Sequence, residues 1–85
     1  MTYKIIIKPS AQKDLDGFSN KELVRFAKRL TLLEDNPRPV GVQKLTDEEG
    51  YRIRSGKYRI LYVIDDKAKS IFIYRIKHRK DAYKR

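Results

Sequence analysis

Four segments of the chain have the composition and spacing of β-strands. They are residues 2–8, 51–55, 58–64 and 70–77. Their β-branched and aromatic residues favour extended backbone, and Ser55-Gly56-Lys57 between the second and third is typical of a hairpin turn. Pro9 is predicted to end the first strand, and residues 42–45 could add a short further strand.

One segment has clear helical spacing. Ser19-Asn20-Lys21-Glu22 has the form of a capping box, in which the Ser19 hydroxyl and the Glu22 carboxylate each accept an amide of the first turn. The apolar residues that follow at helical spacing are Leu23, Phe26, Ala27, Leu30 and Leu33. The prolines of Asn36-Pro37-Arg38-Pro39 end this helix. A shorter helix is predicted from a capping Ser10 to Asp16, with Gly17 as a left-handed stop.

The order β-α-α-β-β-β, with strands segregated from helices, predicts an α+β fold. Two helices would cover one face of a four-stranded antiparallel sheet. The two-residue period of a strand places Tyr51 and Ile53 on one face and Arg52 and Arg54 on the other. Arg59 joins the two arginines only if the register of the hairpin places it on their side. The tyrosines of this hairpin are interpreted as packing residues.

The composition limits what such a fold can be. Eighty-five residues form a single domain, 1–85. The absence of cysteine excludes disulfides and thiolate metal sites, and no apolar segment approaches the ~18 residues of a membrane helix. With one histidine, a metal site would need clustered carboxylates, and Asp47-Glu48-Glu49 is interpreted as a solvated turn. We therefore expect a soluble, cytoplasmic protein with no cofactor.

The positive charge is concentrated in the second half of the chain. Residues 51–85 carry twelve Lys/Arg against three Asp/Glu, a net charge of +9 out of a total of +10. This charge alternates with apolar residues in the predicted strands, which places it on a rigid wall of the sheet. A rigid cationic wall attracts polyanions, and RNA fits better than a membrane, which is usually bound by a basic amphipathic helix.

Several segments resemble the RelE/ParE superfamily of toxins from bacterial and archaeal toxin–antitoxin pairs. They are Lys44-Leu45, residues 50–62, residues 76–83 and the Ser/Ala-x-x-Asp-Leu opening at residues 10–15. The His-Arg-x-x-x-Tyr pattern near the C-terminus points to the RelE branch. The resemblance implies a microbial RNase-like fold and cleavage of messenger RNA in the ribosomal A site. It also implies a cognate antitoxin that neutralises the toxin in a complex able to bind operator DNA.

The resemblance also implies a set of catalytic positions. They match Arg52, Arg54, Arg59, Arg79 and Tyr83. Arg59 and Arg79 are expected to stabilise the charge that develops on the phosphate, because a guanidinium can grip two oxygens. The best-known relatives have lysine where this chain has Arg52 and Arg54, and arginine cannot act as a general base. Either His78 takes the proton of the attacking hydroxyl, or water or the ribosome does.

Two further roles follow from the same segments. Tyr83 either stacks on a splayed base or tethers the C-terminus to the sheet, and stacking is favoured because its surroundings are polar. Non-specific attraction of RNA phosphates is assigned to Lys57, Arg75, Lys77 and Lys80.

Three functions remain open at this point. The first is a ribosome-dependent endoribonuclease toxin, with messenger RNA, the ribosome and an antitoxin as partners and no membrane. The second is a ParE-like inhibitor of DNA gyrase that cuts nothing. The third is an RNA- or ribosome-binding module that has lost nuclease activity, which the exchange of lysine for arginine would explain.

Overall fold

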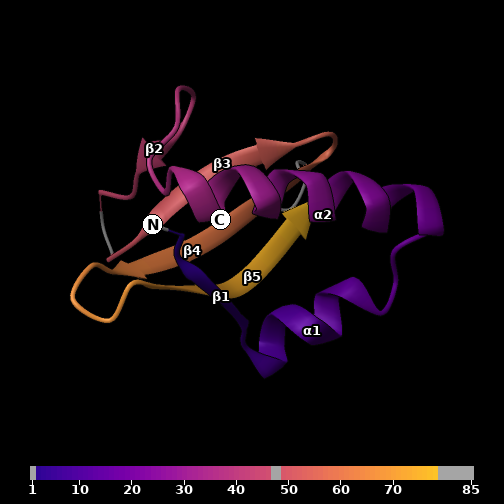
Figure 1. Ribbon diagram of the computed structural model, residues 1–85. Coiled ribbons are helices and arrows are strands. Elements are labelled where there is room, and N and C mark those ends of the chain that lie inside the picture. Colours follow the sequence, from indigo (N-terminus) through magenta and orange to yellow (C-terminus); the bar gives the residue numbers. More distant parts are fainter. Residues whose placement is uncertain (1, 47–48, 79–85) are drawn as a thin grey trace.

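The computed structural model describes residues 2–46 and 49–78 (Figure 1). Its elements in chain order are β1 (Lys4–Ile7), α1 (Pro9–Leu15), α2 (Asn20–Asp35), β2 (Gln43–Lys44), β3 (Tyr51–Ser55), β4 (Tyr58–Asp65) and β5 (Ser70–His78). The predicted α+β class and the predicted order of helices and strands are confirmed. No helix in the described ranges is both long and apolar enough to cross a membrane.

The strands form one mixed sheet in the order β1-β5-β4-β3-β2. The pairs from β5 to β2 are antiparallel, as predicted, but β1 runs parallel to β5. The prediction of an all-antiparallel, four-stranded sheet is therefore wrong in two details. In the sequence, both helices separate β1 from the other strands. They form the crossover connection that allows β1 to lie parallel to β5 at the edge of the sheet. The fifth strand is the short segment foreseen within residues 42–45.

Helix α2 begins with the predicted capping box. The Ser19 hydroxyl accepts the Glu22 amide at 3.2 Å, and the Glu22 carboxylate accepts the Ser19 amide at 2.9 Å. Two orphan donors of the first turn are thereby satisfied. Among the five apolar positions predicted to be buried, Phe26 and Leu33 are buried and Leu30 packs against the core. Leu23 and Ala27 are exposed, because α2 crosses the sheet at an angle and only one narrow stripe touches it (Figure 1).

Helix α1 begins two residues earlier than predicted, with Lys8 in place of Ser10 as its N-cap. Pro9 does end the strand, but it also occupies the first turn of the helix, where a missing amide costs nothing. Lys8 is the N-cap and makes no side-chain cap, so the role predicted for Ser10 is wrong. Gly17 does not adopt a left-handed conformation, since the glycines with positive φ among the described residues are Gly41, Gly50 and Gly56.

The core lies between the two helices and one face of the sheet. Its buried residues are Ala11, Leu15, Phe26, Leu33, Ile53, Ile60, Tyr62, Ile71, Ile73 and Ile76. Tyr62 is fully buried and its hydroxyl donates to the carbonyl of Pro37 at 2.7 Å. Burial raises the pKa of Tyr62. Tyr51 and Tyr58 pack against this core, which confirms the packing role predicted for the hairpin tyrosines.

Candidate nucleic-acid interface

The register of the β3–β4 hairpin places three arginines on the face of the sheet that the helices leave open. Arg54 lies directly opposite Arg59, and Arg52 lies opposite Leu61, the next position of β4 on that face. Arg59 therefore joins Arg52 and Arg54, which the sequence permitted but did not require. These three residues line a hollow of about 250 Å³ together with Gly41 and Gln43. We call this site the arginine hollow.

The three arginines are held differently. Arg59 is only 7% exposed, Arg52 is half-buried and Arg54 is exposed. Arg52 donates to the side-chain oxygen of Gln43, its cross-strand neighbour on β2. The short strand β2 thus positions one guanidinium of the hollow. Like charges directly opposite each other on neighbouring strands are destabilising, so the Arg54–Arg59 pair is one that a bound anion would relieve.

A β-bulge adds a cation from β5 to this face. Tyr62 pairs with Ile73 whereas Leu61 pairs with Arg75, so Tyr74 is an extra residue in β5. The extra residue reverses the alternation of side chains after it, and Lys77 comes to lie opposite Arg59. Arg54, Arg59 and Lys77 therefore form a row across three strands. In a regular ladder Lys77 would lie opposite Tyr58 and point toward the helices.

Helix α1 holds this bulge from the edge of the sheet. β1 ends at Ile7, and beyond that point α1 lies beside β5 (Figure 1). The Ser10 hydroxyl donates to the carbonyl of Tyr74 at 2.6 Å, and the amide of Ile76 donates to the Asp14 carboxylate at 2.8 Å. Two side chains one helical turn apart thus satisfy backbone groups that β1 does not reach. The sequence contained the signal, Ser10 and Asp14 in the Ser/Ala-x-x-Asp-Leu opening, but nothing in it indicated this role.

Two predicted site residues lie away from the arginine hollow. His78 lies opposite Tyr58 on the helix side of the sheet, and its ring contacts the Tyr58 ring edge-on at 5.4 Å. Of the two routes considered for the proton, the one through His78 gains no support from this position, because the bulge turns His78 to the face opposite the arginines. Arg75 forms an ion pair with Asp14 at 2.9 Å, which makes it less available to phosphate than Lys77.

Other predicted residues are placed at the margin or fall outside the described ranges. Lys57 is exposed at the turn of the hairpin. Arg79, Lys80 and Tyr83 lie outside the described residues, so their predicted roles stay predictions. In the described part of the chain no three His, Cys, Asp or Glu side chains come together as a metal site would need.

The chemistry open to the arginine hollow follows from its donors. Each guanidinium presents a planar fork of N–H groups that matches two oxygens of a phosphate. Three such groups on a rigid sheet are pre-organised for an anion whose charge grows during a reaction. The described residues that line the hollow include no imidazole, carboxylate or thiol, so these residues bind and polarise an anion but offer no general base.

Comparison with known proteins agrees with this architecture. Residues 5–83 match the family model described as ParE toxin of type II toxin-antitoxin system, parDE. The putative toxin RelE1 of Methanocaldococcus jannaschii is 32% identical over 88 residues, covering 99% of this chain and 98% of that protein. The toxin RelG of Mycobacterium tuberculosis is 34% identical over 89 residues, with both chains fully covered. The archaeal RelE–RelB complex of Pyrococcus horikoshii contains a similar chain, with 33% identity, a TM-score of 0.81 and coverage of 93% and 97%.

The fold and the site thus define an α+β protein with a cationic open face. The match over nearly the whole length shows that the chain belongs to the ParE toxin family of type II toxin–antitoxin systems. Its similar relatives carry RelE-type names, as the pattern near its C-terminus indicated. The predicted superfamily and its RelE branch are confirmed.

Proposed function

We propose that this toxin is a ribosome-dependent endoribonuclease that cleaves messenger RNA in the ribosomal A site. The observation that carries the proposal is the convergence of Arg52, Arg54 and Arg59 on one hollow of the open face. RelE-type relatives of equal length support the same reading. Its place of action would be the cytoplasm, where ribosomes and message meet.

The proposed reaction needs the RNA itself, positive charge near the phosphate and an acceptor for one proton. The 2′-hydroxyl oxygen attacks the adjacent phosphorus, a new P–O bond forms, and the bond from phosphorus to the 5′-oxygen of the next nucleotide breaks. The products are a 2′,3′-cyclic phosphate and a 5′-hydroxyl. The extra negative charge of the transition state falls on the phosphate oxygens, and Arg54 and Arg59 are assigned to stabilise it.

The proton of the 2′-hydroxyl must go elsewhere than to the arginines. Arginine stays protonated at any working pH, and His78 faces the helix side of the sheet. We assign the proton to water or to a group of the ribosome, and the same solvent returns a proton to the departing 5′-oxygen. Where the ribosome supplies that group, ribosome dependence follows, because the described residues of the arginine hollow provide no proton acceptor.

The test is cleavage on translating ribosomes, mapped by primer extension. The wild-type protein is expected to cut within the A-site codon. Arg59→Ala should lower the single-turnover rate by about 10²–10³, the usual effect of losing one such donor. Because Arg59 is buried, Arg59→Lys serves as a second variant that keeps the charge and loses the fork. Lys67→Ala, in the β4–β5 turn, removes one exposed charge at the other end of the hairpin and should cut normally.

The family description names ParE, the branch to which the competing function belongs. ParE toxins give the matching model its name, so inhibition of DNA gyrase is the second candidate. Intact message together with blocked supercoiling would establish that candidate and overturn the nuclease. If Arg54→Ala and Arg59→Ala both leave growth inhibition unchanged, the arginine hollow is not the active site.

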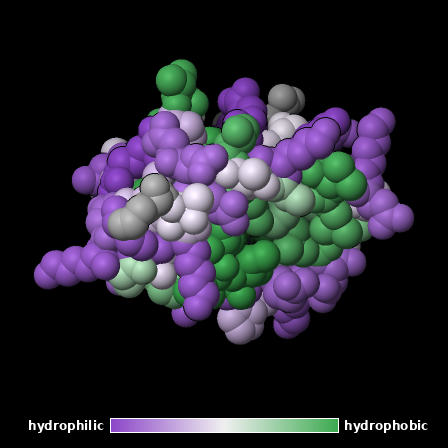
Figure 2. Space-filling view, in the orientation of Figure 1, coloured by the Kyte–Doolittle hydropathy of each residue, from purple (hydrophilic) through white to green (hydrophobic). Residues whose placement is uncertain are grey.

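A cognate antitoxin is the partner we propose for this chain. Similar solved chains are complexes of RelE with RelB. Leu23, Val24 and Leu32 of α2 are 37%, 56% and 57% exposed, and Figure 2 shows apolar surface gathered between the two helices. An acidic partner with an apolar helix face would cover that surface and be attracted by the net charge of +10. By likeness to the family, the complex would bind its operator DNA. Co-purification with the product of a neighbouring short open reading frame tests this.

A further inference from the structure

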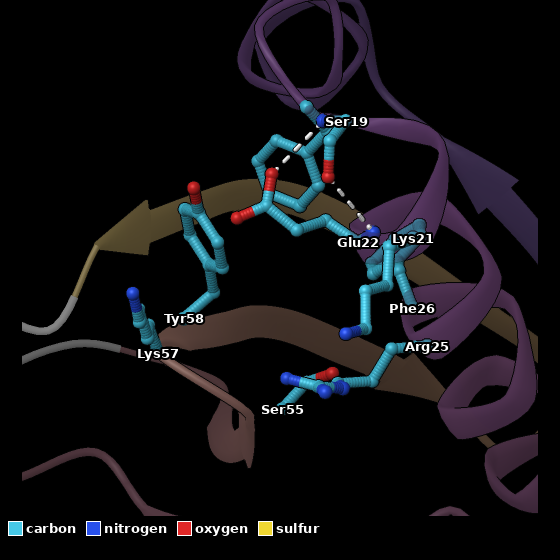
Figure 3. A pocket seen from close by; sticks show the side chains of 9 residues that line it. Ser19, Lys21, Glu22, Arg25, Phe26, Ser55, Lys57 and Tyr58 are labelled. Atoms are coloured by element: carbon cyan, nitrogen blue, oxygen red, sulfur yellow. Dashed lines mark hydrogen bonds between the residues drawn. The ribbon is translucent and has the colours of Figure 1, made fainter.

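A second hollow lies on the helix side of the sheet, between the start of α2 and the tip of the β3–β4 hairpin (Figure 3). It measures about 280 Å³ and we call it the hairpin-tip hollow. Its lining includes three cations, Lys21 and Arg25 from α2 and Lys57 from the hairpin turn. The hairpin thus has cationic hollows on both faces, and Lys57 lies at the turn where the two faces meet.

The one carboxylate of the hairpin-tip hollow is already engaged. Glu22 accepts the Ser19 amide in the capping box, and this hydrogen bond is the main reason that the pKa of Glu22 is lowered. Among the described residues, the ion pairs within 4 Å are Arg38–Asp66 and Arg75–Asp14, so none involves the cations of this hollow. Three cations against one carboxylate leave the hollow with a net positive charge.

Arg25 is seated against the backbone of the hairpin turn. Gly56 has φ +61°, and a Cβ built on it would lie 2.6 Å from an Nη atom of Arg25. The glycine therefore serves two purposes: it adopts the left-handed turn conformation and it leaves room for the guanidinium. Figure 3 shows Arg25 and Lys21 directed from α2 toward the turn, with Lys57 and Tyr58 on the other side. Part of the entropic cost of gripping an anion is therefore met before binding.

The wall beside these cations is aromatic. The Tyr58 ring lies 4.2 Å from the Phe18 ring between centroids, and the His78 ring meets it edge-on at 5.4 Å. Burial and the nearby Glu22 raise the pKa of Tyr58, so its hydroxyl stays a donor. Fixed cations beside aromatic rings are the combination by which proteins hold the backbone and bases of single-stranded nucleic acid.

We propose that the hairpin-tip hollow is a second RNA-binding site that grips a backbone phosphate with Arg25, Lys21 and Lys57. The inference rests on the proposed RNA-directed function and adds to it a site outside the arginine hollow. The phosphate has two sources, the message itself or the structural RNA of the ribosome, and both present the same chemistry. RNA is favoured over an acidic protein segment because the cations continue around the hairpin from one hollow to the other.

Binding of a short single-stranded RNA tests the site in the free protein. Methylation of its 2′-hydroxyls prevents cleavage, and fluorescence anisotropy measures affinity over a range of salt concentrations. If the hollow binds the message, Arg25→Gln and Lys21→Gln should each weaken binding and reduce the slope of log K against log salt by about 0.7, the value for one phosphate contact with a single strand. Lys67→Gln removes the same charge at the far end of the hairpin and should change neither quantity. Thermal unfolding of each variant verifies that the fold is retained.

Binding to ribosomes separates the two sources. If the message fills the hollow, Arg25→Gln weakens both oligonucleotide binding and ribosomal cleavage. If ribosomal RNA fills it, Arg25→Gln leaves oligonucleotide binding intact but weakens binding to ribosomes and its salt dependence. Variants that behave like Lys67→Gln in both assays overturn the proposal. A variant that loses affinity for the antitoxin but keeps its affinity for the oligonucleotide and for ribosomes also overturns it.

Arg54→Gln in the same assays keeps this proposal distinct from the proposed function. If Arg54→Gln weakens RNA binding and Arg25→Gln weakens binding neither to the oligonucleotide nor to ribosomes, only the second site is wrong. If neither variant weakens binding, the RNA-directed function itself fails.

Discussion

The two faces of the β3–β4 hairpin are made from alternate residues of the same two strands, yet they differ in their energetics. On the helix side, Ile53, Ile60 and Tyr62 are at most 3% exposed and belong to the core. On the open side, Arg54 and Arg59 lie directly opposite each other. The first arrangement stabilises the fold by burial, and the second opposes it by like-charge repulsion.

This difference shows how a small domain can hold a cationic site rigidly. The repulsion between arginines is a fraction of a kcal/mol to about 1 kcal/mol per pair, whereas each buried aliphatic side chain contributes about 1.5–3 kcal/mol. The stabilisation from burial on the helix side therefore exceeds the destabilisation from charge repulsion on the open side. The same strands carry both faces, so the arginines inherit the rigidity of the core.

Removing a core residue from the helix side should have the largest effect. Ile60→Ala deletes a fully buried side chain of β4 and should lower the free energy of unfolding by about 2–5 kcal/mol. Urea denaturation measures the loss. Val63→Ala, a half-buried position of the same strand on the open side, should lose less. Equal losses at the two positions would contradict the division of roles between the faces.

Loss of the bulge clamp should come next. Asp14→Ala leaves the amide of Ile76 without its acceptor and should cost about 1–3 kcal/mol. Hydrogen exchange at Ile76 should become faster, and RNA affinity should fall because Lys77 no longer holds its place beside Arg59. Asp14→Asn keeps an acceptor oxygen and should recover most of the protection. Unchanged exchange in Asp14→Ala would show that the bulge stands without α1.

Neutralising an arginine on the open side should raise the free energy of unfolding, whereas the two preceding substitutions should lower it. Arg54→Gln removes the charge opposite Arg59 and should raise the free energy of unfolding by about 0.2–1 kcal/mol while it weakens RNA binding. Lys67→Gln provides the matched control and should leave both unchanged. A clear loss of stability in Arg54→Gln would mean that the open side contributes to the fold.

The smallest effect is expected at the far end of the hairpin, in the β4–β5 turn. Hydrogen bonds from Arg38, and secondarily from Tyr3, lower the pKa of Asp66 below its ordinary value of 3.8. A lowered folded-state pKa contributes stability that is present above the unfolded value and lost as the pH falls through the folded value. Asp66→Asn should therefore be less stable than wild type at neutral pH and equal to it in strong acid. Thermal unfolding across that range decides this, and a difference that persists in acid would rule out the charge as its cause.

Local signals in the sequence predicted the elements but not all of their partners. The capping box at Ser19 and the turn at Gly56 depend on neighbouring residues, so both were readable. The parallel pairing of β1 was not, because Ile5 and Ile71 are 66 positions apart and meet only through the path of the helices. The exposure of Leu23 was missed for a similar reason, since helical spacing does not reveal the angle at which α2 crosses the sheet.

Some residues of the candidate site could likewise be predicted from the sequence, and others could not. The opposite orientation of Arg52 and Ile53 follows from the period of a strand, and the register of the short hairpin then brings in Arg59. The position of Lys77 depends on the bulge at Tyr74, which no residue pattern in β5 predicts. The bulge is held by hydrogen bonds to Ser10 and Asp14 of α1. The same extra residue places His78 on the helix side of the sheet. Arg25 was overlooked because it belongs to the polar side of a helix and gains significance only where Gly56 admits it.

The amino-acid sequence by itself determined the fold class, the family and the cationic nature of one strand face, because each depends on composition and on spacings of a few residues. The tertiary structure alone decided which cations share a surface. That depends on pairing register, on one inserted residue and on side chains of a distant helix, and such long-range contacts are set by how the whole core packs.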